Sequence, residues 1–407
     1  MKKSVLKEYA KLIVNVGANV QKGQEVLITA EMDQPEFVSY VAEAAYKAGA
    51  KKVTVDWKCD ALTKLNAKYQ KLNVLSKVEA WEEAKLQHMV DTLPARIYIM
   101  SEDPDGLKGI SQPKYSKALA ARGKITKPYR QAIDNKHQWT IAAVPGEKWA
   151  KKVFPHLSKK QAVEALWEAI LSCARTEGDG VANWEAHNAE MDAHAAYLNT
   201  KKIRKLHYTA SNGTDLTVGL MERSRFCAAC DVTLSGVKYT PNMPTEEVFT
   251  TPKKGEAEGV VVASMPLSYQ GQLIENFSME FKNGKVVSVK AEKNEALLQR
   301  MVEMDENAGY LGECALVPKE SPINRSGLIF YNTLFDENAS CHLALGMGYD
   351  TCVEGFADLS RDELAEMGVN DSVIHVDFMI GTDDMSIDGI TEDGEIIPIF
   401  RNGTWAF

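Results

Sequence analysis

The sequence predicts an α/β protein in two parts: an N-terminal α/β domain with a mostly parallel open sheet over residues 1–190, and a strand-rich α+β domain over residues 191–407. Three observations lead to this prediction. The chain has 407 residues, more than a single hydrophobic core usually spans. Its first half alternates strand and helix patterns. Its second half is rich in strand patterns, two pairs of which are joined by Asn-Gly turns.

The alternation begins near the N-terminus. Residues 5–16 place apolar side chains at helical spacing, and residues 25–30 form an apolar run typical of a buried strand. Residues 35–48 follow as a helix, with a proline near its start and a glycine just beyond its end. Residues 52–57 are the next strand. This strand–helix–strand unit predicts two parallel strands joined by a right-handed crossover.

The same pattern continues through the first half. Further strands are predicted at residues 96–100 and 139–144, and helices around residues 62–90, 115–133 and 159–175. No GxGxxG motif follows any of these strands, and no GxxxxGK[ST] motif occurs. The first half therefore predicts an open α/β domain without a nucleotide cofactor.

After about residue 190 the pattern changes to closely spaced strands. Residues 206–220 read as a hairpin that turns at Asn212-Gly213. A helix is predicted at residues 296–304. The remaining predicted elements are all strands, at residues 259–265, 274–281, 286–292, 311–317, 341–345 and 373–380.

The composition argues against several functions. A net charge of −9 does not favour nucleic-acid binding, which normally needs a basic face. No run of 18 apolar residues predicts a membrane-spanning helix, and Lys7 and Glu8 interrupt any signal-peptide core. The seven cysteines are odd in number and scattered, so they do not form a disulfide framework. The single CxxC, Cys227 to Cys230, is interpreted as structural, and a cytoplasmic location is the simplest expectation.

Five residues of metal-ligand type lie at or inside short apolar runs of the second half: Glu247, Glu313, His342, His375 and Asp377. Such side chains are costly to bury without partners. In the strand predicted at residues 373–380, His375 and Asp377 point to one face and apolar residues to the other. An imidazole beside a carboxylate on a buried strand is a natural half of a metal site.

Charge balance favours two metal ions over one or none. Three buried carboxylates without cations would be strongly destabilising. Three carboxylates carry three negative charges, two divalent ions carry four positive charges, and a bound hydroxide would neutralise the remainder. Mixed carboxylate and imidazole ligands suit Zn, Co or Mn rather than Ca. The residues therefore predict a two-metal hydrolytic centre, although each one alone also fits a solvated or paired structural role.

Two further features bear on catalysis. Tyr349 follows His342 across a glycine-containing turn, and its phenol could donate to an oxyanion, although a core tyrosine fits the sequence equally well. Asp383 and Asp384 lie in an acidic segment whose spacing is not that of an EF-hand. A turn between strands is its default interpretation, and either aspartate could instead hold the ammonium group of a substrate.

At these positions the chain resembles the M29 family of thermophilic metallo-aminopeptidases. The resemblance rests on four motifs: residues 242–252, residues 311–317, His342 with Tyr349, and residues 375–381. Their order and spacing match those of the family, and the resemblance extends over nearly the whole chain. It implies that Glu247, Glu313, His342, His375 and Asp377 are metal ligands and that Tyr349 is the catalytic tyrosine. It also implies that Glu313 or Asp377 bridges the metals or handles the proton.

The resemblance further implies a cytoplasmic and usually dimeric enzyme that removes N-terminal residues from peptides. It would use two divalent metal ions per chain, drawn from Zn, Co, Mn or Mg, and would need no nucleic acid or membrane partner. Two alternatives stay open. One is another dinuclear metal hydrolase, such as a dipeptidase or an amidohydrolase. The other is a non-catalytic module that binds peptides or metal.

Overall fold

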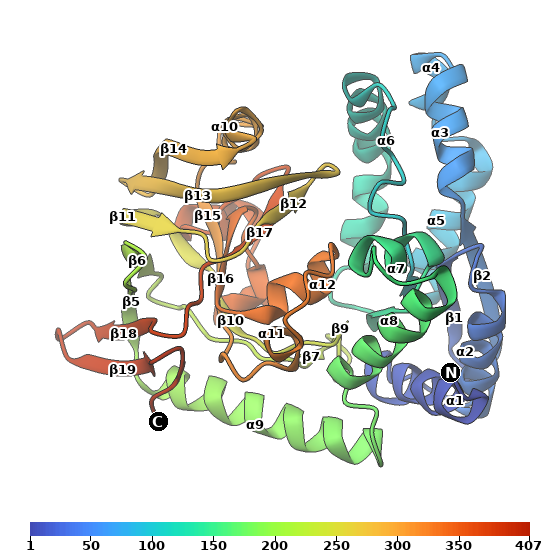
Figure 1. The fold of residues 1–407 in the computed structure, drawn as a ribbon, viewed down its shortest axis with the longest axis horizontal. Helices are drawn as coiled ribbons and strands as arrows, with labels where there is room; N and C mark the ends of the chain where they lie inside the picture. The colour runs from blue at the N-terminus through green and yellow to red at the C-terminus, as the bar shows by residue number, and fades with distance from the viewer. The chain divides into compact units, whose positions relative to one another are not determined.

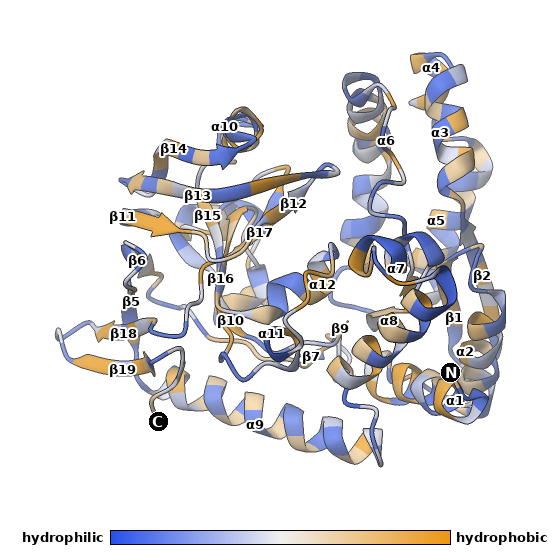
Figure 2. Cartoon of the chain, viewed as in Figure 1, coloured by the Kyte–Doolittle hydropathy of each residue, from blue (hydrophilic) through white to orange (hydrophobic).

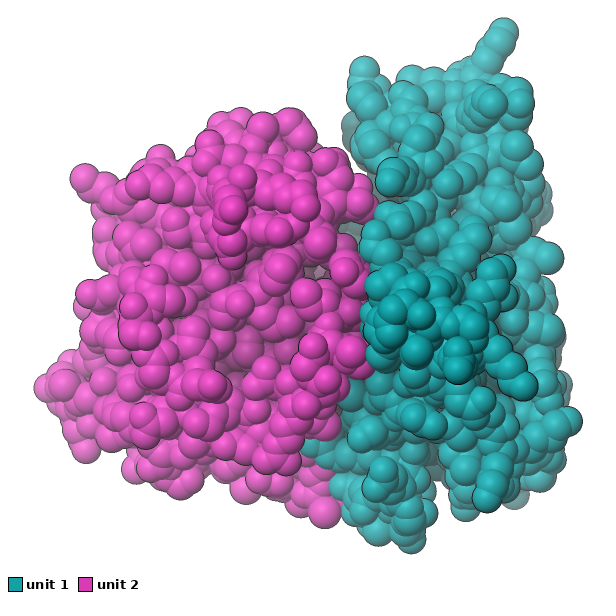
Figure 3. Space-filling model, in the orientation of Figure 1, with its two compact units in different colours: residues 1–185, 230–244 teal, residues 186–229, 245–407 magenta.

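The computed structural model describes residues 1–407, which form two compact units (Figure 1). Unit 1 comprises residues 1–185 and 230–244, and unit 2 comprises residues 186–229 and 245–407. Figure 3 colours the two units separately. Residues 230–244 thus come from the second half of the chain but belong to unit 1, so each unit is assembled from more than one segment of sequence.

Unit 1 is built on a five-stranded sheet in the order β2-β1-β3-β4-β9, in which all neighbours run parallel. Its strands are β1 (Glu25–Glu31), β2 (Lys52–Lys58), β3 (Ala95–Met100), β4 (Trp139–Ala143) and β9 (Asn242–Met243). The helices are α1 (Lys3–Leu12), η1 (Ile13–Gly17), α2 (Pro35–Lys47), α3 (Asp60–Tyr69), α4 (Leu72–Leu75), α5 (Ala80–Thr92), α6 (Gln112–Ile133), α7 (Glu147–Val153) and α8 (Lys159–Cys173). A small ribbon of β7 (Asp231–Val232) and β8 (Lys238–Tyr239) completes the unit.

The inner strand β1 of unit 1 has helices on both sides. The rings of Tyr9, Phe37 and Trp167 pack together and join α1, α2 and α8. Leu27 of β1 packs in a separate cluster with Met89 of α5 and Ile133 of α6. Strands covered in this way read as continuous apolar runs, which explains why the sequence pattern of β1 was clear.

Unit 2 contains two antiparallel sheets. The smaller sheet has the order β10-β15-β16-β17, formed by β10 (Val248–Thr250), β15 (Leu311–Leu316), β16 (His342–Gly346) and β17 (His375–Met379). The larger sheet has nine strands: β5 (Ile203–Thr209), β6 (Asp215–Leu220), β11 (Pro252–Val262), β12 (Leu267–Tyr269), β13 (Gln272–Lys282), β14 (Lys285–Lys293), β18 (Ser386–Thr391), β19 (Ile396–Arg401) and β20 (Thr404–Trp405).

Short helical segments connect these strands. They are α10 (Glu295–Val302), α11 (Pro322–Ser326), α12 (Thr333–Asp336), α13 (Arg361–Met367), and the 3₁₀ turns η2 (Glu337–Ala339), η3 (Asp350–Cys352) and η4 (Phe356–Asp358). One face of the smaller sheet contributes Leu343, Leu345 and Phe378 to the main core of the unit. Phe378 packs there against Phe277 of β13, with ring centroids 6.1 Å apart. The opposite face of the smaller sheet is therefore available to polar side chains.

The structure confirms the predicted fold class, with a parallel α/β sheet in the N-terminal part and antiparallel strands in the C-terminal part. Two details differ. The helix predicted around residues 62–90 is three helices, because the chain is extended at Gln70 and Lys71 and α5 starts at a new capping box formed by Glu79 and Glu82. No helix of the structure has both the length and the apolar character needed to cross a membrane.

A long helix, α9 (Gly180–Thr200), was not predicted at all. Figure 2 shows hydrophilic and hydrophobic residues alternating along it. Sequence prediction of a helix depends on an apolar stripe with a period of 3.6 residues. Because α9 lacks a strong stripe, its helical state was not evident from periodicity.

Candidate metal centre

All five predicted ligand residues lie on or next to the smaller sheet of unit 2. Glu313 lies in β15, and His342 is the first residue of β16. His375 and Asp377 lie in β17, and Glu247 directly precedes β10. The four strands are neighbours in one sheet, so residues that are far apart in sequence meet there.

The strand register places these side chains on the same face. Ala344 of β16 lies opposite Glu313 on one side and opposite Asp377 on the other. Directly opposed residues project to the same face of a sheet, and so do alternate residues of one strand. The small residues Ala344 and Gly346 therefore leave room between the acids and imidazoles that project from the neighbouring strands.

The ligand atoms form two groups of three that share Glu313. One group is Glu247, Glu313 and His342, and the other is Glu313, His375 and Asp377. Within each group the three ligand atoms all lie within 4.8 Å of one another. Two such groups joined through a common carboxylate fit the requirements of a site for two neighbouring cations.

Both histidines are held by the backbone at one ring nitrogen. His375 Nδ1 lies 2.7 Å from the carbonyl oxygen of Met347, and His342 Nδ1 lies 3.2 Å from that of Ser340. Each Nε2 then faces an acid: His342 Nε2 lies 3.1 Å from Glu247, and His375 Nε2 lies 3.1 Å from Glu313. Metal-binding histidines are commonly oriented in this manner, with the second nitrogen bonded to a carbonyl group.

The polar atoms of the centre also fit a bound cation. The buried Oδ1 atom of Asp377 accepts no hydrogen bond, although it lies 3.2 Å from His375 Nε2. Buried polar atoms without partners are costly, and a cation would satisfy this one. Carboxylate and imidazole donors together suit divalent transition metals. The chemistry of the donor set therefore supports metal binding at this face.

Electrostatic coupling shifts the titration of the whole group. Burial raises the pKa of Glu313 to about 7, and the nearby charge of Glu247 adds to this effect. Burial opposes protonation of His342, but its hydrogen bond to Glu247 prevails and raises the pKa of His342 to about 10. Burial also opposes ionisation of Asp377, yet contact with His375 lowers the pKa of that carboxyl. Without metal, bound protons therefore supply part of the positive charge that cations would otherwise supply.

Tyr349 reaches the same group of atoms. Its hydroxyl lies 3.0 Å from His375 Nε2, and its ring meets that of Phe249 edge-on with centroids 5.4 Å apart. Although 38% of the surface of Tyr349 is exposed, desolvation of its phenol and the charges of Glu313 and Asp377 raise the pKa of Tyr349 well above its usual value. The hydroxyl therefore keeps its proton at neutral pH and is available as a hydrogen-bond donor.

Comparison with known proteins places the chain in a family. The family model described as thermophilic metalloprotease (M29) matches residues 2–405. The chain belongs to the M29 metalloprotease family. Among its M29 relatives, aminopeptidase AmpS of Bacillus subtilis (strain 168) is 45% identical over 404 residues, which cover 99% of this chain and 98% of AmpS. Aminopeptidase PepS of Streptococcus thermophilus is 42% identical over 406 residues, with coverage of 99% and 98%.

A solved structure supports the same assignment. Wild-type AmpT from Thermus thermophilus is 39% identical, and it superposes on the M29 protein with a TM-score of 0.91 over 100% of both chains. The predicted family is thereby confirmed, and so is the prediction that the protein is a peptidase. Membership of a metalloprotease family also confirms that it uses divalent metal.

Sequence reasoning missed a further acid near these residues of the M29 protein, Glu337 at the start of η2. Burial and the charges of Asp377 and Glu247 raise the pKa of Glu337 well above its usual value. Glu337 also lines a small pocket together with Asp377. In the sequence it follows Asp336 directly, so the two acids read as a solvated pair, and no pattern distinguished them.

Asp383 and Asp384 are both exposed and lie outside the two ligand groups. The Asp384 carboxylate accepts hydrogen bonds from the backbone N–H of Ser211 at 2.9 Å and from the Thr382 hydroxyl at 2.6 Å. These bonds lower the pKa of Asp384 to about 2. Its oxygens are thus engaged in shaping a turn, whereas Asp383 lines a small pocket beside Lys319 and Ser340.

Because Ala344 separates Glu313 from Asp377 on the sheet, enlarging it should impair metal binding. We expect Ala344→Val to weaken metal affinity on the order of 10–100-fold, as changes beside metal ligands commonly do. Metal content after dialysis, measured by atomic emission, checks this expectation. Ala291→Val in β14 is the matched control, since Ala291 lies in the larger sheet. Equal metal content in both variants would contradict the inference that the small side chain of Ala344 leaves room for metal between Glu313 and Asp377.

Proposed function

We propose that this M29 protein is an aminopeptidase that holds two divalent cations, one in each ligand group, and cleaves the N-terminal residue from peptides. The activity itself follows from the family and from relatives named aminopeptidases that match nearly the whole chain. The observation that supports two cations is the sharing of Glu313 between the two groups. Glu247, Glu313, His342, His375 and Asp377 would hold the cations, with Glu313 common to both groups.

Glu337 changes the charge balance of the proposed centre. Glu247, Glu313, Asp377 and Glu337 together carry four negative charges when ionised, which equals the charge of two divalent cations. A buried group of four acids is tolerated only with such compensation. We therefore include Glu337 in the centre as the carboxylate that balances the second cation.

Bound divalent cations supply a water of lowered pKa and polarise the carbonyl of the scissile bond. The protein residues then have separate tasks in the proposed reaction. The Tyr349 hydroxyl donates a hydrogen bond to the oxyanion that forms on the carbonyl oxygen when water adds to the carbonyl carbon. Glu313 or Asp377 accepts a proton and passes it to the leaving amine. His342 and His375 are kept in place by their carbonyl contacts and hold their Nε2 atoms towards the acids.

The tyrosine role can be tested by removing one oxygen atom. Tyr349→Phe should lower kcat by about 10²–10³-fold, the usual cost of losing one oxyanion donor, while metal content stays unchanged. Steady-state kinetics with leucine p-nitroanilide, together with metal analysis, measures both effects. Tyr310→Phe is the control, because the Tyr310 ring packs beside Lys254 and Lys285 instead. A kcat within threefold of the wild type would remove Tyr349 from the mechanism.

Restriction to the N-terminus requires recognition of the free ammonium group. We propose an acid beside the centre for this role, with Asp383 favoured over Asp384 because the oxygens of Asp384 already accept two hydrogen bonds. Unblocked peptides should therefore be cleaved, and their N-acetylated forms should be cleaved much more slowly, since acetylation removes the positive charge that the acid would bind. Liquid chromatography of matched peptide pairs checks this. Comparable cleavage of both forms would favour a different dinuclear hydrolase, such as an amidohydrolase.

Metal analysis addresses the number and identity of the ions. We propose two ions per chain, drawn from Zn, Co, Mn or Mg, and a ratio near two in protein purified without chelator supports this. A ratio near one would reduce the centre to a single cation. We also propose a cytoplasmic homodimer, and light scattering coupled to size-exclusion chromatography would show its mass directly.

A further inference from the structure

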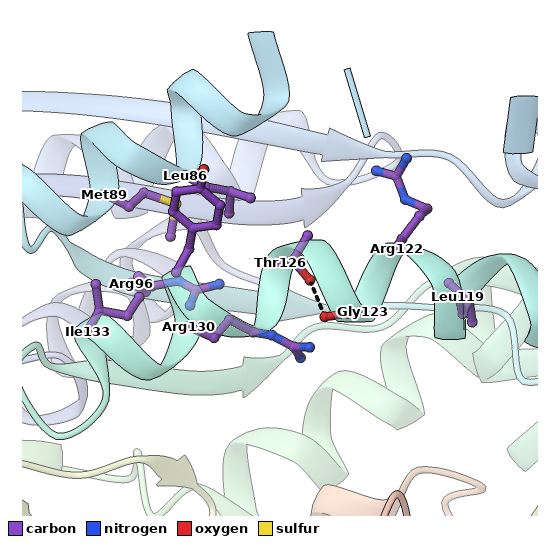
Figure 4. A pocket seen from close by; sticks show the side chains of 10 residues that line it. Leu86, Met89, Arg96, Leu119, Arg122, Gly123, Thr126, Arg130 and Ile133 are labelled. Carbon is purple, nitrogen blue, oxygen red and sulfur yellow. Dashed lines mark hydrogen bonds between the residues drawn. The ribbon is translucent and has the colours of Figure 1, made fainter. Parts of the chain in front are cut away.

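A larger cavity lies in unit 1, on the α5 and α6 side of the parallel sheet (Figure 4). Its volume is about 450 Å³, which is within the range of small-molecule sites. The apolar part of its wall includes Leu86 and Met89 from α5 and Leu119 and Ile133 from α6. The cavity is thus large enough for a small ligand with an apolar body.

Arg96 is an unusual residue for the place that it occupies in this wall. It lies in β3, an inner strand of the sheet, directly opposite Leu27 of β1. Leu27 packs against Met89 and Ile133, so the same layer is otherwise hydrophobic. An arginine there gives up hydration of its charge unless something else compensates it.

The structure shows no compensating acid for Arg96. Its Nε atom is buried and makes no hydrogen bond, and its guanidinium lies over the ring of Tyr98, 5.0 Å from the centroid. No ion pair involves it. A planar guanidinium with unused donors is suited to bind a carboxylate in a two-point contact.

The other two arginines of the cavity differ from each other. Arg122 is already engaged, since it pairs with Glu82 at 2.5 Å and also donates to the carbonyl oxygen of Lys77. Arg130 lines the cavity without an ion pair or hydrogen bond, and Figure 4 shows it nearer to Arg96 along α6 than Arg122 is. The cavity therefore presents two uncompensated positive charges, and none of its lining residues is an acid.

We propose that this cavity binds a small organic carboxylate with an apolar body, such as an aryl-substituted or branched short-chain acid. Arg96 would pair with the carboxylate, Arg130 would add a second positive charge, and the leucine, methionine and isoleucine side chains would cover the apolar body. A free amino acid fits poorly, because its ammonium group would meet no acid in the cavity. Inorganic phosphate fits poorly, because it has no apolar part. This site is separate from the metal centre, so the proposal does not depend on the peptidase mechanism.

Isothermal titration calorimetry on the full-length, metal-loaded protein tests this proposal with 4-phenylbutyrate as the probe. We expect one site per chain, at least tenfold weaker binding of the uncharged 4-phenylbutanamide, and no detectable heat with inorganic phosphate. Arg96→Gln should weaken 4-phenylbutyrate binding at least tenfold, whereas Arg300→Gln on the exposed surface of α10 should leave it unchanged. Peptidase activity should be the same in both variants, which also shows that both are folded.

A second variant keeps the test decisive if Arg96→Gln does not fold. Thr126 lines the same cavity from α6, and Thr126→Trp would fill it without removing a charge. This variant should lose 4-phenylbutyrate binding while Arg96 remains. The proposal is overturned if 4-phenylbutyrate does not bind, if the amide binds as well as the acid, or if neither variant changes the affinity.

Discussion

Exhaustive chelation should reduce hydrolysis of aminoacyl-nitroanilides to background, the largest effect that we expect for this protein. The two ligand groups bring three carboxylates and two imidazoles together, a donor set that suits divalent metals. Metal ions lower the activation free energy of such reactions by several kcal/mol, and each 1.36 kcal/mol corresponds to a tenfold change in rate. The measurement is the initial rate after dialysis against 1,10-phenanthroline and EDTA, in roughly millimolar excess as for any tight divalent site.

Readdition of Zn, Co, Mn and Mg in separate samples is the control, because recovered activity excludes irreversible denaturation. Activity that survives when the metal content is below a tenth of the chain concentration would refute a metal-dependent mechanism. The order in which the ions restore activity would also show which of them the centre prefers, which geometry alone does not decide.

Metal removal should also make stability depend on pH. In the metal-free state the pKa of His342 is raised to about 10 and that of Glu313 to about 7, so the folded protein binds protons more tightly than the unfolded chain. The stability from these protons is complete below the unfolded pKa values and is lost as pH rises through the folded ones. Thermal unfolding of chelated protein should therefore show a lower Tm at pH 9 than at pH 6. Metal-loaded protein should show a smaller difference, since cations replace the protons.

Glu313→Gln should lower kcat by about 10³-fold or more while the fold persists. Glu313 is the only residue that both ligand groups share, so the neutral amide weakens both at once. A bound cation stabilises the transition state by several kcal/mol, and losing that stabilisation corresponds to a fall in kcat of about 10³-fold. Kinetics, metal content and far-ultraviolet circular dichroism of the variant together measure the effect.

Glu306→Gln is the matched control for that substitution. It makes the same chemical change on an exposed residue outside both groups, and it should retain wild-type kinetics. Glu247→Gln provides a second comparison, because Glu247 belongs to only one ligand group. This variant should lose one cation and leave the other group intact. A normal rate in Glu313→Gln would exclude Glu313 as the bridging ligand.

The sequence revealed the five ligand residues because they violate a simple physical expectation. Glu313 and His342 lie inside apolar runs, and His375 and Asp377 alternate with the apolar residues of the same strand. A charged group in such a place needs a partner, so these residues could be grouped without coordinates. The structure brings all five within the two ligand groups, and their roles as ligands remain predictions for the experiments above.

Glu337 shows the limit of the same reasoning. It lies beside Asp336 at the end of a short helix, where two acids are usually solvated. Asp336 instead accepts backbone hydrogen bonds from Phe330 and Asn332, while Glu337 lies close to the charges of Asp377 and Glu247. The two adjacent acids have different surroundings because of the path that the chain takes between α12 and β16, and the local sequence does not specify that path.

By itself, the sequence determined the alternating architecture of the first half, the strand-rich second half and the residue types of the metal centre. These follow from local periodicity and from the cost of burying charge, which act over a few residues. Tertiary structure alone decided that residues 230–244 add β9 to the parallel sheet, that Ala344 leaves room between two acids, and that Arg96 faces an apolar cavity. Each of these depends on strand pairing between distant segments, and no local pattern specifies which distant partner a strand will have.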